Sequence, residues 1–166
     1  MATLRPVTST DATSALERVR AELARAGHAD GIVELATDVP TAAAAAEQLG
    51  CQVGAIANSL VFEADGAPLL VVASGGHRVD VRKAARHAGV RKVRRATPEF
   101  VYEATGQRVG GVAPVGHPAP LRTLVDTALA DHAEVWAGAG VAYAMFRTTF
   151  AELVTLTGGE AVEVGA

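Results

Sequence analysis

Residues 54–74 read GAIANSLVFEADGAPLLVVAS. Two stretches rich in β-branched and apolar residues, Gly54–Phe62 and Leu69–Ser74, flank the segment EADGAP, whose Asp-Gly pair is a strong hairpin signal. We therefore expect two antiparallel strands joined by a tight turn. The segments on either side decide what kind of sheet this hairpin joins.

Outward from the hairpin, helical and strand patterns alternate irregularly. Upstream we expect a helix over Thr13–Ala26, a strand over Ile32–Leu35, and a helix capped by Thr41 and ended by Gly50. Downstream, the expected elements are helices over Asp80–His87, Thr97–Gly106 and Thr149–Leu156, with strands over Lys92–Arg95, Arg122–Leu129, Glu134–Ala137, Val141–Phe146 and, at an edge, Ala161–Val164. Strands in hairpins, interrupted by helices without a strict βαβ rhythm, indicate an α+β fold with a mixed or barrel-like sheet.

Length and composition favour one globular domain over residues 1–166, with its core at about 13–164. Apolar residues make up 49% of the chain and charged residues 20%, as in ordinary globular proteins. No apolar run reaches the roughly 18–20 residues that span a bilayer, and the start of the chain lacks a signal-peptide pattern. We therefore expect a cytoplasmic protein without a membrane partner. The aromatic content of 4% argues against rows of base-stacking rings.

Several kinds of catalytic site lack their sequence patterns. The five histidines show no zinc-binding spacing, and the chain contains no GxSxG elbow, P-loop or dinucleotide fingerprint. A single cysteine, Cys51, excludes an internal disulfide and is expected to be a buried thiol rather than a nucleophile. We therefore expect no metal and no cofactor.

Basic residues concentrate between His77 and Arg95. This segment holds eight Lys and Arg residues against one acid, Asp80, for a net +7; the whole chain carries −3, which leaves −10 elsewhere. Such a basic segment could bind a polyanion locally. A solvated helix face would show the same pattern, so the charge alone leaves both interpretations open.

The segment GQRVGGVAPVGHPAP, residues 106–120, is too rich in glycine and proline for a regular element. Consecutive glycines let backbone N–H groups turn toward a ligand, and prolines fix the neighbouring chain. Such a loop can hold a carbonyl oxygen while negative charge develops on it, without a catalytic side chain. A rigid connector between strands is the alternative.

The order of these features is similar to that of a known family over about Leu16 to Val164. The matching pieces are Thr41-Ala42-Ala43, Ala45-Ala46, Leu49-Gly50, Ile56-Ala57-Asn58-Ser59-Leu60-Val61-Phe62, Ser74-Gly75-Gly76-His77-Arg78-Val79-Asp80, Lys83-Ala84-Ala85, Lys92-Val93-Arg94-Arg95-Ala96-Thr97-Pro98, Thr105-Gly106, Gly110-Gly111-Val112-Ala113-Pro114-Val115-Gly116, Val125-Asp126 and Leu156-Thr157-Gly158. In this order and spacing they resemble the YbaK/prolyl-tRNA-synthetase-associated domain family.

The resemblance implies an α+β domain with a mixed, partly barrel-like sheet and surrounding helices. It also implies editing in trans, the hydrolysis of the ester that joins a wrong, small amino acid such as alanine, serine or cysteine to tRNA. Family members use no metal, and the terminal hydroxyl of the tRNA is thought to help activate water. The expected partner is aminoacyl-tRNA, with an aminoacyl-tRNA synthetase as a second candidate; DNA is not expected.

The resemblance assigns roles to three groups of residues. The catalytic group is Asn58, Gly110, Gly111 and Val112; the substrate-binding group is Thr41, Ser59, Gly75, Ala113, Pro114, Gly116, His117 and Pro118; the tRNA-binding group is Arg78, Arg82, Lys83 and Arg86. Editing members typically carry a lysine where this chain has Asn58, and an amide supplies hydrogen bonds but no charge. His117, beside the loop, could restore a donor or a base.

Three functions remain open. The first is a deacylase whose site uses Asn58 as a donor to an altered substrate. The second is a module of the same fold that binds aminoacyl-tRNA or a synthetase without chemistry, which the missing lysine would explain. The third is hydrolysis of a free amino-acid ester or amide without tRNA.

Overall fold

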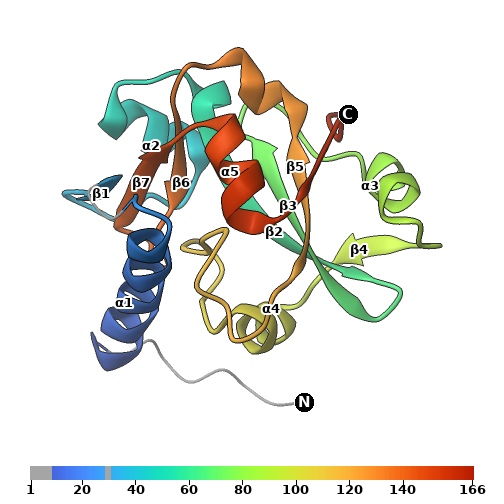
Figure 1. The fold of residues 1–166 in the computed structure, drawn as a ribbon, viewed down its shortest axis with the longest axis horizontal. Helices are drawn as coiled ribbons and strands as arrows, with labels where there is room; N and C mark the ends of the chain where they lie inside the picture. Colours follow the sequence, from blue (N-terminus) through green and yellow to red (C-terminus); the bar gives the residue numbers. More distant parts are fainter. Residues whose placement is uncertain (1–8, 29–30) are drawn as a thin grey trace.

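A computed structural model of the chain describes residues 9–28 and 31–166, and Figure 1 shows their arrangement. The helices of this part are α1 (Ser9–Arg25), α2 (Ala42–Leu49), α3 (Val81–Ala88), α4 (Pro98–Thr105), α5 (Phe150–Thr157) and the 3-10 helices η2 (Val53–Ala55) and η3 (Thr127–Asp131). The strands are β1 (Ile32–Glu34), β2 (Ile56–Ala64), β3 (Ala67–Ser74), β4 (Val93–Arg95), β5 (Arg122–Asp126), β6 (Val135–Gly138), β7 (Ala144–Thr148) and β8 (Glu160–Val162). No helix of the described residues is long and apolar enough to cross a membrane.

The expected hairpin lies at the centre of a mixed sheet. Strands β2 and β3 pair antiparallel, and the sheet order is β1-β7-β6-β2-β3-β5-β8, with β4 added beside β2. The β2–β6, β3–β5 and β5–β8 pairs are parallel, whereas β6–β7, β1–β7 and β2–β4 are antiparallel. The predicted α+β fold with a mixed sheet is therefore confirmed.

Helices α2 to α5 begin and end where the capping residues predict. Each begins at a side chain that accepts a backbone N–H of the first turn, and each ends at a glycine in the left-handed region; the caps are Thr41, Asp80, Thr97 and Thr149, and the glycines are Gly50, Gly89, Gly106 and Gly158. Helix α1 differs, because it begins at Ser9 rather than at Thr13.

Local side-chain chemistry accounts for one strand that was predicted too long. The strand expected over Arg122–Leu129 ends at Asp126, because the Asp126 carboxylate accepts the Ala128 N–H at 3.0 Å and starts the 3-10 helix η3. At two other expected strand starts, Gly54 lies in η2 and β7 begins at Ala144 instead of Val141. The edge strand is confirmed, over Glu160–Val162 rather than Ala161–Val164.

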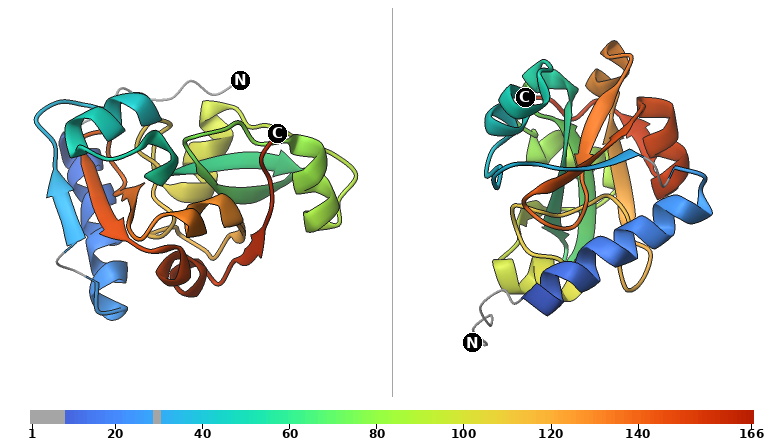
Figure 2. Two further views of the ribbon diagram at one scale, coloured as in Figure 1. Left: turned by 90° about the horizontal axis from the view of Figure 1, so that it is seen from above. Right: turned by 90° about the vertical axis from the view of Figure 1, so that its left-hand side faces the viewer.

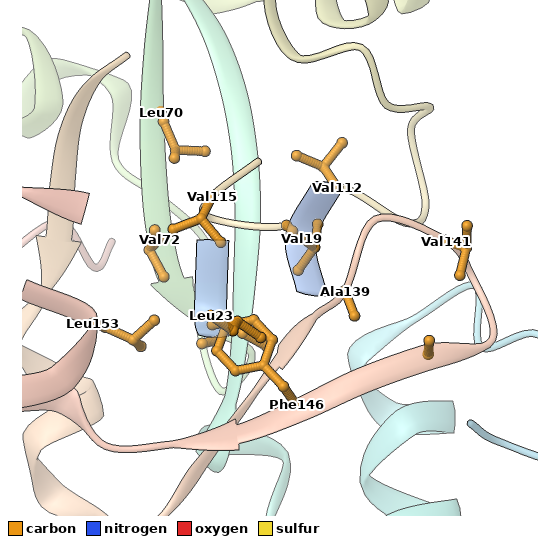
Figure 3. Packing of buried hydrophobic residues seen from close by; sticks show 14 of the residues in the cluster. Val19, Leu23, Leu70, Val72, Val112, Val115, Ala139, Val141, Phe146 and Leu153 are labelled. Carbon is orange, nitrogen blue, oxygen red and sulfur yellow. The ribbon is translucent and has the colours of Figure 1, made fainter. Parts of the chain in front are cut away.

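The main core lies between the sheet, α1 and the 106–121 segment. Val19 and Leu23 of α1 are fully buried against Phe146 of β7 and Leu70 of β3. Figure 3 shows Val112 and Val115 of the glycine-rich loop in the same cluster as these residues. The loop is therefore anchored by apolar side chains of its own.

The two sides of the molecule carry different elements. The 106–121 segment lies between α1 and α4, and α3 and β4 lie at the opposite side of the molecule from α1 (Figure 1). Viewed from the side, α1 runs obliquely across the strands next to that segment (Figure 2, right). This arrangement puts the glycine-rich loop beside the middle of β2.

Candidate functional site

Strand β2 has a gap in the pairing along one of its edges. On that edge, β6 pairs with Ile56 and Ala57, and β4 pairs with Phe62 to Ala64. Between them, no strand of the described residues pairs with positions 58–61 on this side. A sheet edge with unpaired backbone groups is a ready binding surface for another chain or a ligand.

The register of the hairpin shows which backbone groups face this gap. The N–H of Gly75 donates to the carbonyl of Ile56 at 2.8 Å, and Ala64 lies opposite Ala67 across the turn. Because hydrogen-bonded pairs alternate along an antiparallel ladder, the even-numbered residues of β2 bond to β3. Ser59 and Val61 therefore direct their N–H and C=O groups into the gap.

A cavity of about 260 Å³ opens on the gap. Its walls come from α2 and the segment before it, from β2, from the glycine-rich loop and from the turn between β6 and β7. The lining includes Thr41, Asn58, Ser59, Gly110, Gly111 and Val112, which are six of the residues predicted for the site. The structure thus brings together residues that are up to 71 positions apart in sequence.

A larger groove of about 960 Å³ adjoins this cavity along β2. The two share Asn58, Ser59, Leu60, Val109, Gly110 and Val112, so they are continuous at the gap. Arg78 and Arg95 line the groove together with His77. A small cavity that opens into a long groove bearing cations suits a small group attached to a polyanion.

The buried amide of Gln107 holds the glycine-rich loop in shape. Gln107 is 1% exposed; its Oε1 accepts the Ala113 N–H at 2.7 Å and its Nε2 donates to the Val115 carbonyl at 3.1 Å. The loop is also held sterically at Gly111, where a Cβ would lie 2.6–2.8 Å from backbone atoms of Val141 and Ala142. Gly110 has φ +98°, a conformation that side-chain-bearing residues rarely adopt.

Some backbone N–H groups of the loop have a hydrogen-bond partner in the described part of the chain, and others do not. The N–H of Gly111 donates to the Arg108 carbonyl at 3.1 Å, and the N–H of Ala113 is taken by Gln107. The N–H groups of Gly110 and Val112 have no such partner among the residues that the model describes. Both residues line the cavity, so these two amides are the loop donors that can serve a ligand.

Two polar side chains of the cavity differ in their availability. The Ser59 Oγ is buried and has no hydrogen-bond partner in the described part of the chain. The Thr41 Oγ1 accepts the Ala44 N–H at 3.1 Å as the cap of α2. A buried hydroxyl without a partner is costly, and a bound polar group would satisfy it.

Several predicted substrate-binding residues lie away from the cavity. Gly75 packs against α2 and η2, where a Cβ would lie 2.7 Å from the Ala42 Cβ and the Val53 carbonyl. Pro114, Gly116 and His117 line a separate surface pocket beyond the loop; Ala113 is fully buried, and the Pro118 ring lies near Gly106. The resemblance marked these residues, but in this fold they support the loop rather than line its cavity.

His117 in particular is not placed to act as a base. Its Nε2 lies 2.8 Å from the Ala113 carbonyl. Burial lowers the pKa of the imidazole below its ordinary value, although the bond to Ala113 acts in the opposite direction. The half-buried ring is thus part of the loop's support.

The four predicted tRNA-binding residues are also separated. Arg78 lines the groove, whereas Arg82 and Arg86 are exposed on α3 outside it. Lys83 is engaged, because its Nζ donates to the Gly165 carbonyl at 2.7 Å and to Glu163 at 3.1 Å. The ammonium group of Lys83 is thus engaged by the C-terminal segment, and its contact with tRNA stays a prediction.

Some site residues were missed from the sequence. Gly138 of β6 and Met145 of β7 line the cavity, and Arg95 of β4 lines the groove. Gly138 has a steric role, since a Cβ there would lie 2.8 Å from the Val112 carbonyl. Gly138 and Met145 lie in no motif, and the motif that contains Arg95 assigned it no role in the site; the close approach of distant strands brings these residues to the site.

The remaining candidates for chemistry do not line the cavity, although His77 lines the groove. Burial raises the pKa of the Cys51 thiol, which disfavours the thiolate, and the thiol is only partly buried rather than buried as expected. Within the described ranges, no group of three or more His, Cys, Asp or Glu side chains could hold a metal ion. The carboxylate of Asp126 is fully buried and bonds His77 and the Ser74 N–H, which fixes the turn after β3.

Comparisons with known proteins identify the family of this chain. A model of the aminoacyl-tRNA editing domain matches residues 36–156, which include the cavity, the groove and the loop. YwhH of Bacillus subtilis (strain 168), an uncharacterized protein, is 34% identical over 102 residues, or 61% of this chain and 64% of YwhH. A proline–tRNA ligase of Levilactobacillus brevis is 30% identical over 94 residues, or 57% of this chain and 16% of the ligase. The matches thus span less than two thirds of either relative.

Solved structures give the same result for the whole fold. A protein described as a candidate trans-editing enzyme for prolyl tRNA synthetase superposes with a TM-score of 0.85 and 39% identity, over 99% of each chain. The hypothetical protein APE2540 superposes with a TM-score of 0.82 and 29% identity, over 90% of this chain and 99% of its own. The resemblance inferred from the sequence is confirmed, and the chain belongs to the aminoacyl-tRNA editing domain family.

Proposed function

We propose that this chain is a deacylase that acts in trans, hydrolysing the ester between a small amino acid such as alanine, serine or cysteine and a mischarged tRNA. The observation that carries the proposal is the continuity of the 260 Å³ cavity with the cation-bearing groove at the gap in β2. The cavity would hold the aminoacyl group, and the groove would hold the end of the tRNA.

The chemistry needs stabilisation of an oxyanion more than it needs a side-chain base. When water attacks the ester carbonyl, negative charge develops on its oxygen, and the N–H groups of Gly110 and Val112 are placed to donate to that oxygen. Collapse of the tetrahedral species releases the amino acid and returns the ribose hydroxyl of the tRNA. Such preorganised donors contribute about 10²–10³-fold each to comparable reactions.

Asn58 would supply hydrogen bonds to the substrate in place of the usual lysine. It lies where the cavity meets the groove, so its amide can donate to the ester or to the sugar of the terminal nucleotide. Replacing a charged contact by a neutral one would weaken an interaction by about 1.5–3 kcal/mol. The unpaired backbone of Ser59 and Val61 and the free Ser59 hydroxyl offer compensating hydrogen bonds at the same place.

Incubation of the purified protein with a panel of mischarged tRNAs tests the proposal. We expect ester hydrolysis above the spontaneous rate for at least one small amino acid, and a reduced rate for Asn58→Ala. Asn58→Lys distinguishes two explanations of the asparagine. A lower rate than wild type indicates a site adapted to asparagine, and a higher rate indicates a site weakened by the loss of lysine.

A binding module without chemistry is the second candidate, and the absence of lysine at Asn58 favours it. It predicts tight binding of aminoacyl-tRNA or a synthetase with no hydrolysis of any member of the panel. Hydrolysis that appears only in Asn58→Lys would also support this candidate over an active wild-type enzyme. A hydrolase for free esters would instead act on an alanine ester without tRNA.

A further inference from the structure

A second cavity, of about 230 Å³, lies on the other side of the glycine-rich loop. It shares Val109, Gly111, Val141 and Ala142 with the first cavity, and the close packing of Gly111 on the Val141–Ala142 backbone forms the wall between them. Its lining also includes Arg108, Tyr102, Tyr143 and Asp38. The deacylase proposed above makes no use of these side chains.

The guanidinium of Arg108 is the unusual group in this cavity. Its Nε and Nη2 are buried and have no hydrogen-bond partner among the described residues. The Tyr102 ring holds it from one side, with the guanidinium carbon 4.9 Å from the ring centre. A buried charged donor pair without a partner is strongly disfavoured, and its fork geometry matches a carboxylate or a phosphate group.

Asp38 supplies a charge of the opposite sign to the same cavity. Asp38 is an exposed residue next to Val39, whose N–H donates to the Ala142 carbonyl at 2.9 Å, and it forms no ion pair with Arg108 within the described part of the chain. Two opposite charges that line one cavity without meeting are complementary to a ligand that carries both. A phosphate dianion would satisfy Arg108 but would be repelled by Asp38.

We propose that this second cavity binds a free α-amino acid. Its carboxylate would pair with the Arg108 fork and its ammonium group with Asp38, while the side chain would lie among Ala15, Val109 and Val141. The volume lies below the roughly 300–1,000 Å³ typical of drug-sized ligand sites, which suits so small a molecule. A ligand here contacts the loop that forms the wall of the first cavity, so its occupancy is coupled to the loop.

Equilibrium binding, followed by NMR chemical shifts, tests the site with L-alanine, L-serine and L-proline as probes. We expect binding with a Kd in the millimolar range or below, with shifts at Arg108 and Tyr143. Alanine amide lacks the carboxylate and N-acetylalanine lacks the ammonium group, and each should bind about 10–100-fold more weakly. Inorganic phosphate is the last probe; if it binds more tightly than the amino acids, the site is for anions and the proposal fails.

Five variants locate the binding. Arg108→Gln and Asp38→Asn should each weaken amino-acid binding about 10–100-fold. Arg108→Lys keeps the charge but not the fork, so its affinity for the amino acid should lie between those of Arg108→Gln and wild type. Arg91→Gln, an exposed arginine outside the cavity, should have no effect. Asn58→Ala should also keep the binding, because it alters only the first cavity.

The outcomes keep this proposal separate from the deacylase. Binding that Asn58→Ala abolishes and Arg108→Gln leaves intact would place the amino acid in the first cavity and overturn the inference. Equal binding of alanine and its amide would overturn it as well. Circular dichroism and a thermal melt of Arg108→Gln and Arg108→Lys exclude unfolding as the cause of lost binding, and none of these measurements requires tRNA or activity.

Discussion

At the scale of single residues, the glycines of the loop have different functions. Gly110 is needed for its backbone conformation, whereas Gly111 is needed because backbone atoms of Val141 and Ala142 leave no room for a Cβ. The sequence shows two adjacent glycines that look equivalent. Only their surroundings assign one to ligand contact and the other to packing.

Gly111→Ala should therefore displace the loop from its wall. We expect a loss of about 1–3 kcal/mol in the free energy of unfolding and a fall in deacylation of about 100-fold or more, since the Gly110 and Val112 amides would move. Urea melts and single-turnover hydrolysis measure the two effects. Gly66→Ala is the control, because its φ of +90° also disfavours a side chain but it lies in the hairpin turn; it should cost stability and leave the rate unchanged.

His117 should give the protein a pH-dependent stability. Burial lowers its pKa in the folded state, so the unfolded chain binds the proton more tightly. The neutral imidazole makes its full contribution to the free energy of unfolding above the unfolded pKa of about 6.5. The free energy of unfolding then falls as the pH drops through that value toward the lower pKa of the folded state.

Urea melts at about pH 7.5 and 5.5 measure this difference. His117→Gln should reduce the loss of stability between the two pH values, and His87→Gln, at an exposed position on α3, should retain the wild-type loss. The same loss in His117→Gln as in wild type would show that another group titrates.

At the scale of elements, the glycine-rich loop is irregular in backbone but rigid in support. Gln107 bonds both sides of it, and Val112 and Val115 insert into the core (Figure 3). The sequence indicated a loop and left open whether it was a site or a connector. In the structure it is a rigid connector that also lines the cavity, so the two interpretations are compatible.

Gln107→Met should loosen the loop while keeping the size of the side chain. The Ala113 N–H and the Val115 carbonyl would lose their partner, at a cost of about 1–3 kcal/mol in stability. Hydrogen exchange at Ala113 should accelerate more than at the central strands. Gln48→Met, which breaks the exposed bond from Gln48 to Thr37, is the matched control and should change neither stability nor exchange appreciably.

At the scale of the whole molecule, the basic segment is divided by the fold. Glu63 pairs with Arg94 at 2.9 Å, and the C-terminal segment engages Lys83. Arg78 and Arg95 line the groove. Some cations of the segment are thus held in structural pairs and others line the groove, and polyanion binding by the segment stays a prediction.

Binding of tRNA should depend on this division. We expect Arg78→Gln and Arg95→Gln each to weaken tRNA binding and to reduce the slope of log K against log salt by about 1, as the loss of one phosphate contact does. Arg82→Gln and Arg86→Gln should change the slope less. Filter binding over a salt series measures the slopes, and equal slopes for all four variants would mean that the groove is not the tRNA path.

The sequence by itself determined the hairpin, the starts and ends of α2 to α5, the mixed α+β fold and the family. These depend on signals that act over a few residues, such as Asp-Gly turns, Thr and Asp caps and terminal glycines, or on the order of many short motifs. Cavity residues such as Asn58 and Gly110 were also found in this way, because the motifs that carry the resemblance contain them.

Only the tertiary structure decided the rest. The gap in the edge of β2 exists because β6 and β4 pair with its two ends. Both strands come later in the chain, and only the folded sheet brings them beside β2. The sequence suggested a functional role for Lys83 because its own segment does not contain the carbonyl of Gly165, to which the Lys83 Nζ donates. Side-chain roles of this kind follow from contacts between distant segments, and the free energy of those contacts is set by packing that no local pattern encodes.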